Sequence, residues 1–190
     1  FVRTHNIEHK YYYGLAKRMN IALGEAYYKQ YNLESTHILL MNLYGPNDHF
    51  DEFRGHVIPA IIKKIDNAKI NKLTSIDIYG DGSPIREFVY VDDAAKLIIQ
   101  ASTIDGFEYF NLGSGQLMKI WDVLETIKSE IKFDGDFVKD MAKPMGHPIK
   151  QFDLSKMKSL LGEFKYTPFS EGITKTVEWF YTNVKNNNAL

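Results

Sequence analysis

The chain has 190 residues and a mass of 22.0 kDa, which suits one domain rather than several. Hydrophobic residues make up 44% and charged residues 25%, a balance that excludes a disordered or collagen-like chain. The 23 basic and 24 acidic side chains give a formal net charge of −1, so no overall positive field favours nucleic acid or an anionic membrane.

The first part of the chain predicts a helix, a strand and a second helix. Residues 13–31 carry apolar residues three and four positions apart, which is the period of an amphipathic helix. Residues 36–43 are short and rich in Ile and Leu, and a turn follows them, which predicts a buried strand of a parallel sheet. After the polar loop 47–55, residues 56–70 predict a helix with isoleucines inside and lysines outside.

Strands and helices alternate through the remaining residues. The patterns predict strands at 75–79, 87–91, 107–112 and 137–139. They predict helices at 92–102, 120–131, 155–161 and 170–185, with Asp92 as the N-cap of the first of these. For residues 142–151 the sequence predicts an irregular loop. The alternation of strands and helices predicts an α/β protein.

Several common sites are absent from this sequence. It contains no cysteine, so disulfides, zinc–thiolate sites and cysteine nucleophiles are excluded from this segment, and the composition is compatible with a cytoplasmic location. No apolar run approaches the roughly 18 residues of a membrane-spanning helix. Neither GxGxxG nor GxxxxGK occurs, and the chain starts at Phe1 without a secretory pattern. We therefore expect the chain to begin part-way into a larger fold.

Tyr13 and Lys17 are a candidate pair for proton transfer. A spacing of four residues places the phenol and the ammonium on one face of a helix, and the nearby cation favours the phenolate. The same spacing occurs a second time, in Tyr181 and Lys185. Because chance alone accounts for such pairs in a chain rich in Tyr and Lys, the spacing does not by itself identify an active site.

The segments after Tyr13 carry a resemblance to a known family. In order they are THILLMNLYGP, GHVIPAIIKKI, IYGDGSPIREFVYVDDAAKLI, FNLGSG, DLSKMKSLLG and EGITKTVEWF. This succession resembles the extended short-chain dehydrogenase/reductases that act on nucleotide sugars, the NAD-dependent epimerase/dehydratase family. NLYGP, HVIPA and REFVYVDD are the most specific parts, and the resemblance covers essentially the whole chain.

The resemblance implies an architecture. It is the latter part of a Rossmann-type parallel sheet plus a small mixed α/β substrate-binding domain, with the dinucleotide-binding half missing. Residues 1–55 would be the remainder of the Rossmann-type domain. Residues 56–190 would bind the nucleotide sugar, with some elements returning to the sheet.

The resemblance also implies a reaction and its partners. The expected reaction, in a full-length parent, is NADPH-dependent 3,5-epimerisation and 4-reduction of GDP-4-keto-6-deoxy-D-mannose to GDP-L-fucose. The cofactor would be NADP(H), the substrate a GDP-sugar, and the fragment alone inactive. A homodimer would form through the helix that contains Tyr13 and Lys17.

Each catalytic role follows from the resemblance. Tyr13 would donate the proton to C4 of the sugar, and Lys17 would hold the nicotinamide ribose. His56 would be the acid/base of epimerisation, a task that suits imidazole near neutral pH; without the resemblance, it would be an ordinary residue at a helix N-terminus. Asn42 and Leu43 end a strand at the sheet edge where α/β folds bind ligands, and they would contact the cofactor together with Tyr13, Lys17 and His56.

The implied substrate contacts are basic and aromatic. Lys64 and Arg86 would bind the diphosphate, and the planar guanidinium of Arg86 matches phosphate oxygens well. Tyr79 would lie against the base. Lys143 belongs to the loop that closes over the sugar nucleotide in relatives.

That loop departs from the family pattern KPDGTxRKxxD. Met145, His147 and Ile149 replace Asp, Thr and Arg, which leaves the exact sugar and nucleotide open. One alternative is a GDP-deoxysugar or deoxyheptose 4-reductase, or a nucleotide-sugar 4-epimerase. Another is a non-catalytic nucleotide-sugar-binding module. The polar residues 48–52 have no metal-ligand spacing, so we expect no metal site.

Overall fold

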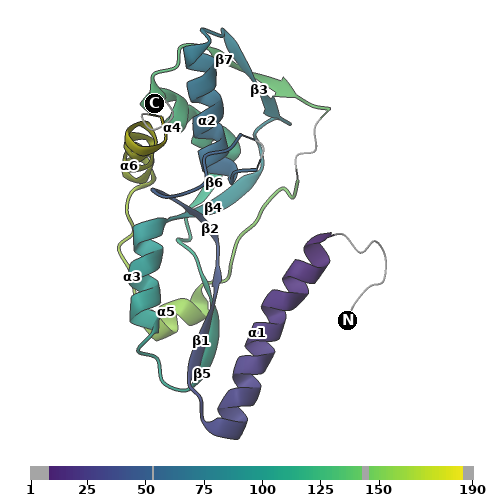
Figure 1. The fold of residues 1–190 in the computed structure, drawn as a ribbon, viewed down its shortest axis with the longest axis vertical. Helices are drawn as coiled ribbons and strands as arrows, with labels where there is room; N and C mark the ends of the chain where they lie inside the picture. The colour runs from purple at the N-terminus through teal and green to yellow at the C-terminus, as the bar shows by residue number, and fades with distance from the viewer. Residues whose placement is uncertain (1–8, 53, 143–145, 186–190) are drawn as a thin grey trace.

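The computed structural model describes residues 9–52, 54–142 and 146–185, and Figure 1 shows its fold. The helices are α1 (His9–Tyr31), α2 (Val57–Ile70), α3 (Val91–Ala101), α4 (Ile120–Ile131), α5 (Ser155–Leu161) and α6 (Phe169–Trp179), followed by the π-helix η1 (Phe180–Lys185). The strands are β1 (Ser35–Leu40), β2 (Asn42–Tyr44), β3 (Ser75–Tyr79), β4 (Ile85–Tyr90), β5 (Phe107–Leu112), β6 (Leu117–Lys119) and β7 (Asp136–Asp140). The predicted α/β class is confirmed.

The described strands form three small sheets. β1 pairs in parallel with β5, and β3 pairs in parallel with β7. β4 lies between β2, which is parallel to it, and β6, which is antiparallel. The parallel pairs are joined by crossovers that contain helices, as parallel pairing requires.

Two hydrophobic cores hold these elements together. One lies around β1, β5, α3 and α5 and includes Met41, Val89, Leu97, Phe110, Leu112 and Met157. The other lies around α2, α4 and α6 and includes Tyr44, Ile58, Ile62, Ile127, Ile173 and Phe180. In Figure 1, β2 and β4 run between the end that carries α1, β1 and β5 and the end that carries α2, β3 and β7. β2 and β4 therefore connect the two ends of the molecule.

The strand predicted at residues 36–43 changes partner part-way along. β1 ends at Leu40, Met41 donates its backbone N–H to the Leu112 carbonyl at 3.0 Å, and β2 then pairs with β4. The buried Met41 side chain lies at the crossing point. Hydrophobicity alone predicts one continuous strand because both pieces are partly buried.

Two further predictions need correction. Asp92 is not the N-cap of α3: β4 continues to Tyr90, and α3 begins directly afterwards at Val91. The predicted helix 170–185 is α6 followed by the π-helix η1. This wider turn brings Tyr181 and Lys185 together on Asp66 of α2. The sequence analysis also missed β6, a strand of three residues.

Helix α1 contacts the rest of the protein along one face. A Cβ on Gly24 would collide with His37 of β1, and Tyr28 lies against Gly106, so close packing occurs at that end of the helix. Large apolar side chains spaced by four residues stay exposed on another face; this α1 stripe consists of Leu15, Met19, Leu23, Tyr27 and Tyr31. No helix in the described part of the chain is long and apolar enough to cross a membrane.

Candidate active site

A cleft of ≈ 840 Å³ lies where α1, β2 and the start of α2 meet. Four of the five residues predicted for catalysis or cofactor binding line it, namely Tyr13, Asn42, Leu43 and His56. We call it the Tyr13 cleft. Its volume lies in the usual range for a small-molecule site. Residues that are far apart in the sequence therefore share one concave surface.

Lys17, the fifth predicted residue, lies one helical turn from Tyr13. Its Nζ is 5.3 Å from the centroid of the Tyr13 ring, so the ammonium and the phenol are neighbours on α1 as the spacing predicts. Tyr13 is 68% exposed, which leaves its hydroxyl accessible from the cleft. The geometry allows a proton donor with an adjacent cation.

The second pair with the same spacing has a structural role. Tyr181 donates its hydroxyl to Asp66 Oδ1 at 3.0 Å, and Lys185 binds the same oxygen at 2.7 Å. Burial and the nearby Asp66 carboxylate raise the pKa of Tyr181 well above its ordinary value. Tyr181 is therefore held in its neutral form by the core, as expected for the chance match.

His56 is the residue directly before α2, at the mouth of the cleft. Its backbone is extended (φ −63°, ψ 168°), and its Nδ1 lies 3.6 Å from Asp48 Oδ1, which is an ion-pair contact. The loop that leads to it is tight, because Gly55 donates its N–H to the Asp51 carbonyl at 2.9 Å and a Cβ there would collide with that oxygen. This close approach explains a glycine before His56.

Residues 42–44 form one wall of the cleft. Asn42 donates from Nδ2 to the Glu87 carbonyl at 2.9 Å, which ties β2 to β4 beyond the backbone ladder. Tyr44 is 3% exposed and its hydroxyl points to the Phe169 carbonyl at 3.4 Å. Burial, with Asp93 nearby, raises the pKa of Tyr44 well above its ordinary value. A neutral, immobile tyrosine thus supports the wall.

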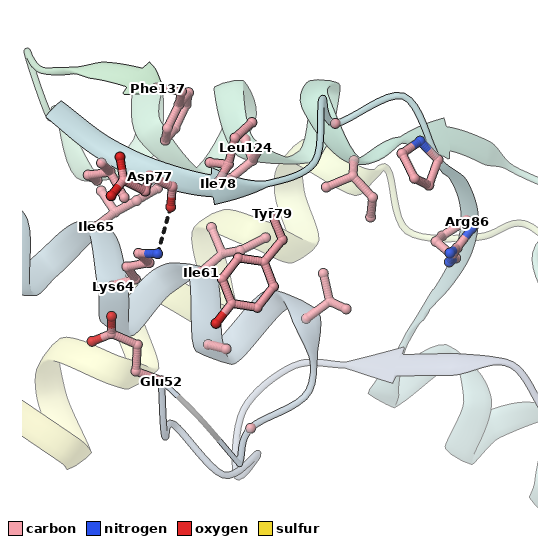
Figure 2. Close-up of a pocket in the computed structure, with 17 residues that line it drawn as sticks. Glu52, Ile61, Lys64, Ile65, Asp77, Ile78, Tyr79, Arg86, Leu124 and Phe137 are labelled. Atoms are coloured by element: carbon pink, nitrogen blue, oxygen red, sulfur yellow. Dashed lines mark hydrogen bonds between the residues drawn. The ribbon is translucent and has the colours of Figure 1, made fainter. Parts of the chain in front are cut away.

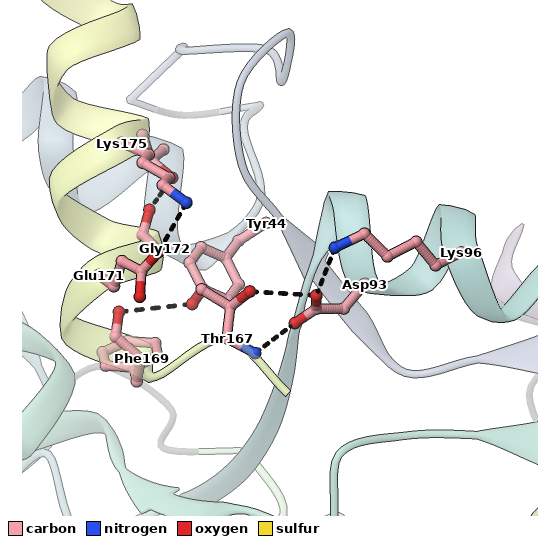
Figure 3. A network of polar contacts seen from close by, with 9 residues as sticks. Tyr44, Asp93, Lys96, Thr167, Phe169, Glu171, Gly172 and Lys175 are labelled. Carbon is pink, nitrogen blue, oxygen red and sulfur yellow. Dashed lines mark hydrogen bonds and ion pairs between the residues drawn. The ribbon is translucent and has the colours of Figure 1, made fainter. Parts of the chain in front are cut away.

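A buried carboxylate joins that wall to the segment before α6. Asp93 Oδ2 accepts the backbone N–H of Thr167 at 2.7 Å, and Oδ1 accepts the Thr167 hydroxyl at 3.0 Å (Figure 3). Lys96 lies 3.7 Å from Oδ1. Through these contacts α3 fixes the turn into α6, against which Tyr44 packs.

A second cavity, of ≈ 440 Å³, lies between α2 and β3 and brings together Lys64, Tyr79 and Arg86 (Figure 2). We call it the α2–β3 pocket. Lys64 Nζ donates to the Asp77 carbonyl at 2.6 Å and lies 5.7 Å from the Tyr79 ring centroid. Arg86 donates from Nη1 to its neighbour's carbonyl, Ile85, at 2.7 Å, and the half-buried guanidinium keeps other donors.

The two cavities adjoin, because Gly55 and Val57 line both of them. Lys143, the remaining predicted substrate contact, lies outside the described residues. The segment that follows it is attached to β4, since Ile85 donates its N–H to the Pro148 carbonyl at 2.7 Å. A Cβ on Gly146 would lie 3.4 Å from Arg86 Nη2, so this segment borders the guanidinium.

The sequence analysis missed Glu87 as a structural residue of the site. Its side chain is fully buried, and its carboxylate accepts backbone N–H groups from Gly115 at 2.7 Å and Phe152 at 3.4 Å. A charged residue directly before the apolar run Phe88–Tyr90 is the signal that could have found it. Asp48, beside His56, gave no such signal, because acidic residues are common in polar loops.

In the described ranges, no group of three or more His, Asp or Glu side chains is arranged to hold a metal ion. The candidate site therefore consists of a phenol, an ammonium, an imidazole with a neighbouring carboxylate, and a pocket that carries cations and an aromatic ring. These groups suit proton transfer beside a phosphorylated ligand.

Comparisons with known proteins show the family of this chain. Residues 2–113 match the model of the NAD dependent epimerase/dehydratase family. The probable GDP-L-fucose synthase 1 of Oryza sativa subsp. japonica is 36% identical over 174 residues, covering 91% of this chain and 53% of the relative. GDP-L-fucose synthase 1 of Arabidopsis thaliana is 36% identical over 176 residues, covering 92% of this chain and 54% of the relative.

A solved structure shows the same likeness. The crystal structure of a GDP-L-fucose synthetase from Naegleria fowleri bound to NADP superposes with a TM-score of 0.86 at 32% identity. The match covers 91% of this chain and 56% of that one. This chain thus spans about half the length of the curated relatives it matches.

Proposed function

Because this chain belongs to the NAD dependent epimerase/dehydratase family, we propose that it acts in an NADPH-dependent enzyme on a GDP-sugar. The proposed reaction converts GDP-4-keto-6-deoxy-D-mannose to GDP-L-fucose by epimerisation at C3 and C5 and reduction at C4. The names of the relatives support GDP-L-fucose as the product. The observation that carries the proposal is the junction of the Tyr13 cleft and the α2–β3 pocket at Gly55 and Val57.

The α2–β3 pocket would hold the nucleoside diphosphate. The Arg86 guanidinium offers paired donors to phosphate oxygens, and Lys64 adds a second positive charge to the pocket. Tyr79, 62% exposed, presents a ring against which a base can stack. Lys143 would complete the contacts to the diphosphate. The sugar would then lie at the junction, facing the Tyr13 cleft.

The Tyr13 cleft fits the nicotinamide end of NADPH. Its wall combines the polar Asn42 with the apolar Leu43, which suits an amide-bearing aromatic ring, and Lys17 would hold the adjoining ribose. The sequence contains no glycine-rich phosphate turn, so these residues fit that end of the cofactor alone. When bound, NADPH supplies the hydride that C4 receives.

Tyr13 would protonate the oxygen at C4 as the ketone is reduced. The Lys17 ammonium next to the ring stabilises the phenolate that remains after proton transfer. His56 would exchange protons at C3 and C5, carbons that the neighbouring ketone acidifies. Asp48, beside Nδ1, would orient the ring and leave Nε2 as the exchanging atom.

The proposed enzyme is a cytoplasmic homodimer that pairs α1 with its copy. The α1 stripe supports this arrangement, because side chains spaced by four residues form a ridge that can pack against the same ridge of a second helix. Its members are 43–69% exposed.

Tyr13→Phe tests the proposed reaction. In the protein that carries this chain, the substitution removes the phenolic proton and should lower turnover by about 10²-fold or more, with little change in KM. NADPH oxidation with the GDP-4-keto-6-deoxy sugar measures it, and Tyr12→Phe on the same helix is the matched control. Wild-type turnover in Tyr13→Phe would remove Tyr13 from the mechanism. A wild-type protein that does not oxidise NADPH with this sugar would overturn the proposed function itself.

A further inference from the structure

The α2–β3 pocket has charged side chains on both sides of Tyr79. Figure 2 shows Arg86 at one end and Glu52 near the other, with the Tyr79 ring between them. The wall that connects the ends is largely apolar and includes Ile61, Ile65, Ile78, Leu124 and Phe137. A ligand that is anionic at one end, flat in the middle and rich in hydrogen-bond donors at the other end would satisfy the whole pocket.

The Glu52 carboxylate is held in position by α2. Asn67 donates from Nδ2 to Glu52 Oε2 at 3.2 Å, and the Glu52 side chain is half-buried. Among the described residues, none donates a hydrogen bond to Oε1. Because Glu52 lines the pocket, this oxygen can accept a hydrogen bond from a ligand.

We propose that Glu52 recognises guanine and makes the α2–β3 pocket selective for GDP-sugars. The inference rests on the proposed function, which places a nucleoside diphosphate in this pocket. An ionised carboxylate only accepts hydrogen bonds, and it can accept two side by side. The Watson–Crick edge of guanine presents two adjacent donors, N1–H and the 2-amino group, whereas adenine and uracil alternate donors with acceptors. Guanine alone among them matches Glu52 with two donors.

Asp77 is the competing carboxylate in the same pocket. Its backbone carbonyl accepts the Lys64 ammonium, while its side chain is exposed on β3 and no described side chain fixes it. Because Asn67 already holds the Glu52 carboxylate, Glu52 would lose less side-chain entropy than Asp77 when it binds the base. Asp77→Asn therefore makes the same charge change in the same pocket and serves as the matched control.

Calorimetric titration of the protein that carries this chain tests the inference with GDP, inosine diphosphate and ADP as probes. Inosine diphosphate keeps N1–H but lacks the 2-amino group. Wild type should bind GDP roughly tenfold or more tightly than inosine diphosphate, because a hydrogen bond to a charged group carries about that factor. In Glu52→Gln the affinities for GDP and inosine diphosphate should differ by less than about threefold. Glu52→Asp, which keeps the charge but withdraws the carboxylate, should also lower the preference for GDP.

The outcomes separate this inference from the proposed function. The inference is supported if Glu52→Gln loses the preference for GDP over inosine diphosphate while Asp77→Asn keeps it. If Glu52→Gln binds GDP and keeps the wild-type preference for GDP over inosine diphosphate, the inference is wrong and the proposed function stands. The same holds if only Asp77→Asn loses this preference. If wild type binds none of the three nucleotides, the GDP-sugar assignment fails as well. Thermal unfolding of each variant checks that its fold is retained.

Discussion

His56 depends on its neighbours for its place in the cleft. The residue precedes α2, its side chain is 84% exposed, and the Asp48 carboxylate is its ion-pair partner. An exposed imidazole without a neighbouring charge would adopt several rotamers, and Asp48 limits this freedom. His56 and Asp48 therefore form a pair, and the sequence motif identified only the histidine.

His56→Asn should impair epimerisation more than reduction. Asparagine keeps a polar side chain but cannot exchange protons near neutral pH, so deuterium incorporation from solvent at C3 and C5 should slow by about 10²-fold or more. Mass spectrometry of the recovered sugar measures it, with His49→Asn as the control, because His49 does not line the Tyr13 cleft. Undiminished labelling at both carbons would leave His56 as an ordinary residue at a helix N-terminus.

Elements that keep one residue pattern from end to end were predictable, and strands whose ends are set by pairing were not. β3, β5, α4 and α5 begin and end where their residue patterns predict. The run 36–43 becomes two strands because Met41 is the point where the chain passes from β5 to β4, and a hydrophobic period carries no information about partners. Asp92 fails as an N-cap for a similar reason, since pairing with β2 extends β4 to Tyr90.

The same limit applies to the candidate site. The motifs around Tyr13, Asn42 and His56 identified residues that the fold gathers in one cleft. Glu87 and Asp93 were not foreseen, because their partners in the loops after β5 and before α6 are distant in the sequence. Buried carboxylates that accept backbone N–H groups are recognised only once the tertiary contacts are known.

A pair of glycine substitutions tests how α6 supports the cleft wall. A Cβ on Gly172 would collide with the Tyr44 hydroxyl and lie 2.9 Å from Cζ, and Tyr44 is buried. Gly172→Ala should therefore destabilise the protein by about 1–3 kcal/mol. Gly14 of α1 faces open space, so Gly14→Ala should stabilise it by about 0.5–1 kcal/mol. Urea unfolding measures both, and equal stability of Gly172→Ala and wild type would contradict the close contact.

The half-buried Tyr166 side chain makes the stability of the fold depend on pH. Its hydroxyl donates to the Gly113 carbonyl at 2.5 Å, and burial, with Glu87 nearby, raises its pKa from 10.0 to about 12. A raised pKa means that the folded state holds the proton more tightly. Its contribution to stability is therefore complete below pH 10 and is lost as the pH rises towards 12.

We expect the free energy of unfolding to fall above pH 10, and to fall less steeply in Tyr166→Phe. Burial also raises the pKa of Tyr44 and Tyr181, so part of the fall remains in the variant. Denaturant unfolding at a series of alkaline pH values measures the slopes, and Tyr109→Phe, at an exposed position, is the control. Identical slopes in Tyr166→Phe and wild type would show that the Tyr166 proton is not linked to folding.

At the scale of the whole molecule, the position of α1 decides whether the site is complete. The α2–β3 pocket is built on one core, whereas Tyr13 is carried by a helix that packs closely on β1 near Gly24 and Tyr28, more than two turns away. A proton donor must lie within hydrogen-bond reach of the sugar oxygen, so the helix needs further support. A second copy packed on the α1 stripe would supply it. Association and turnover should then be linked.

Leu23→Glu places a charge in the middle of the α1 stripe, at a side chain that is 48% exposed. In a dimer that buries the stripe, the carboxylate would lose its hydration without gaining a partner, so the dimer should dissociate. Turnover should fall with it, because Tyr13 would lose the support of the second helix. Sedimentation velocity and NADPH oxidation measure the two effects. Lys29→Glu also introduces a carboxylate, at an exposed position about 120° around the helix axis from Leu23, and should preserve both association and turnover. A Leu23→Glu protein that still dimerises would show that another surface forms the interface.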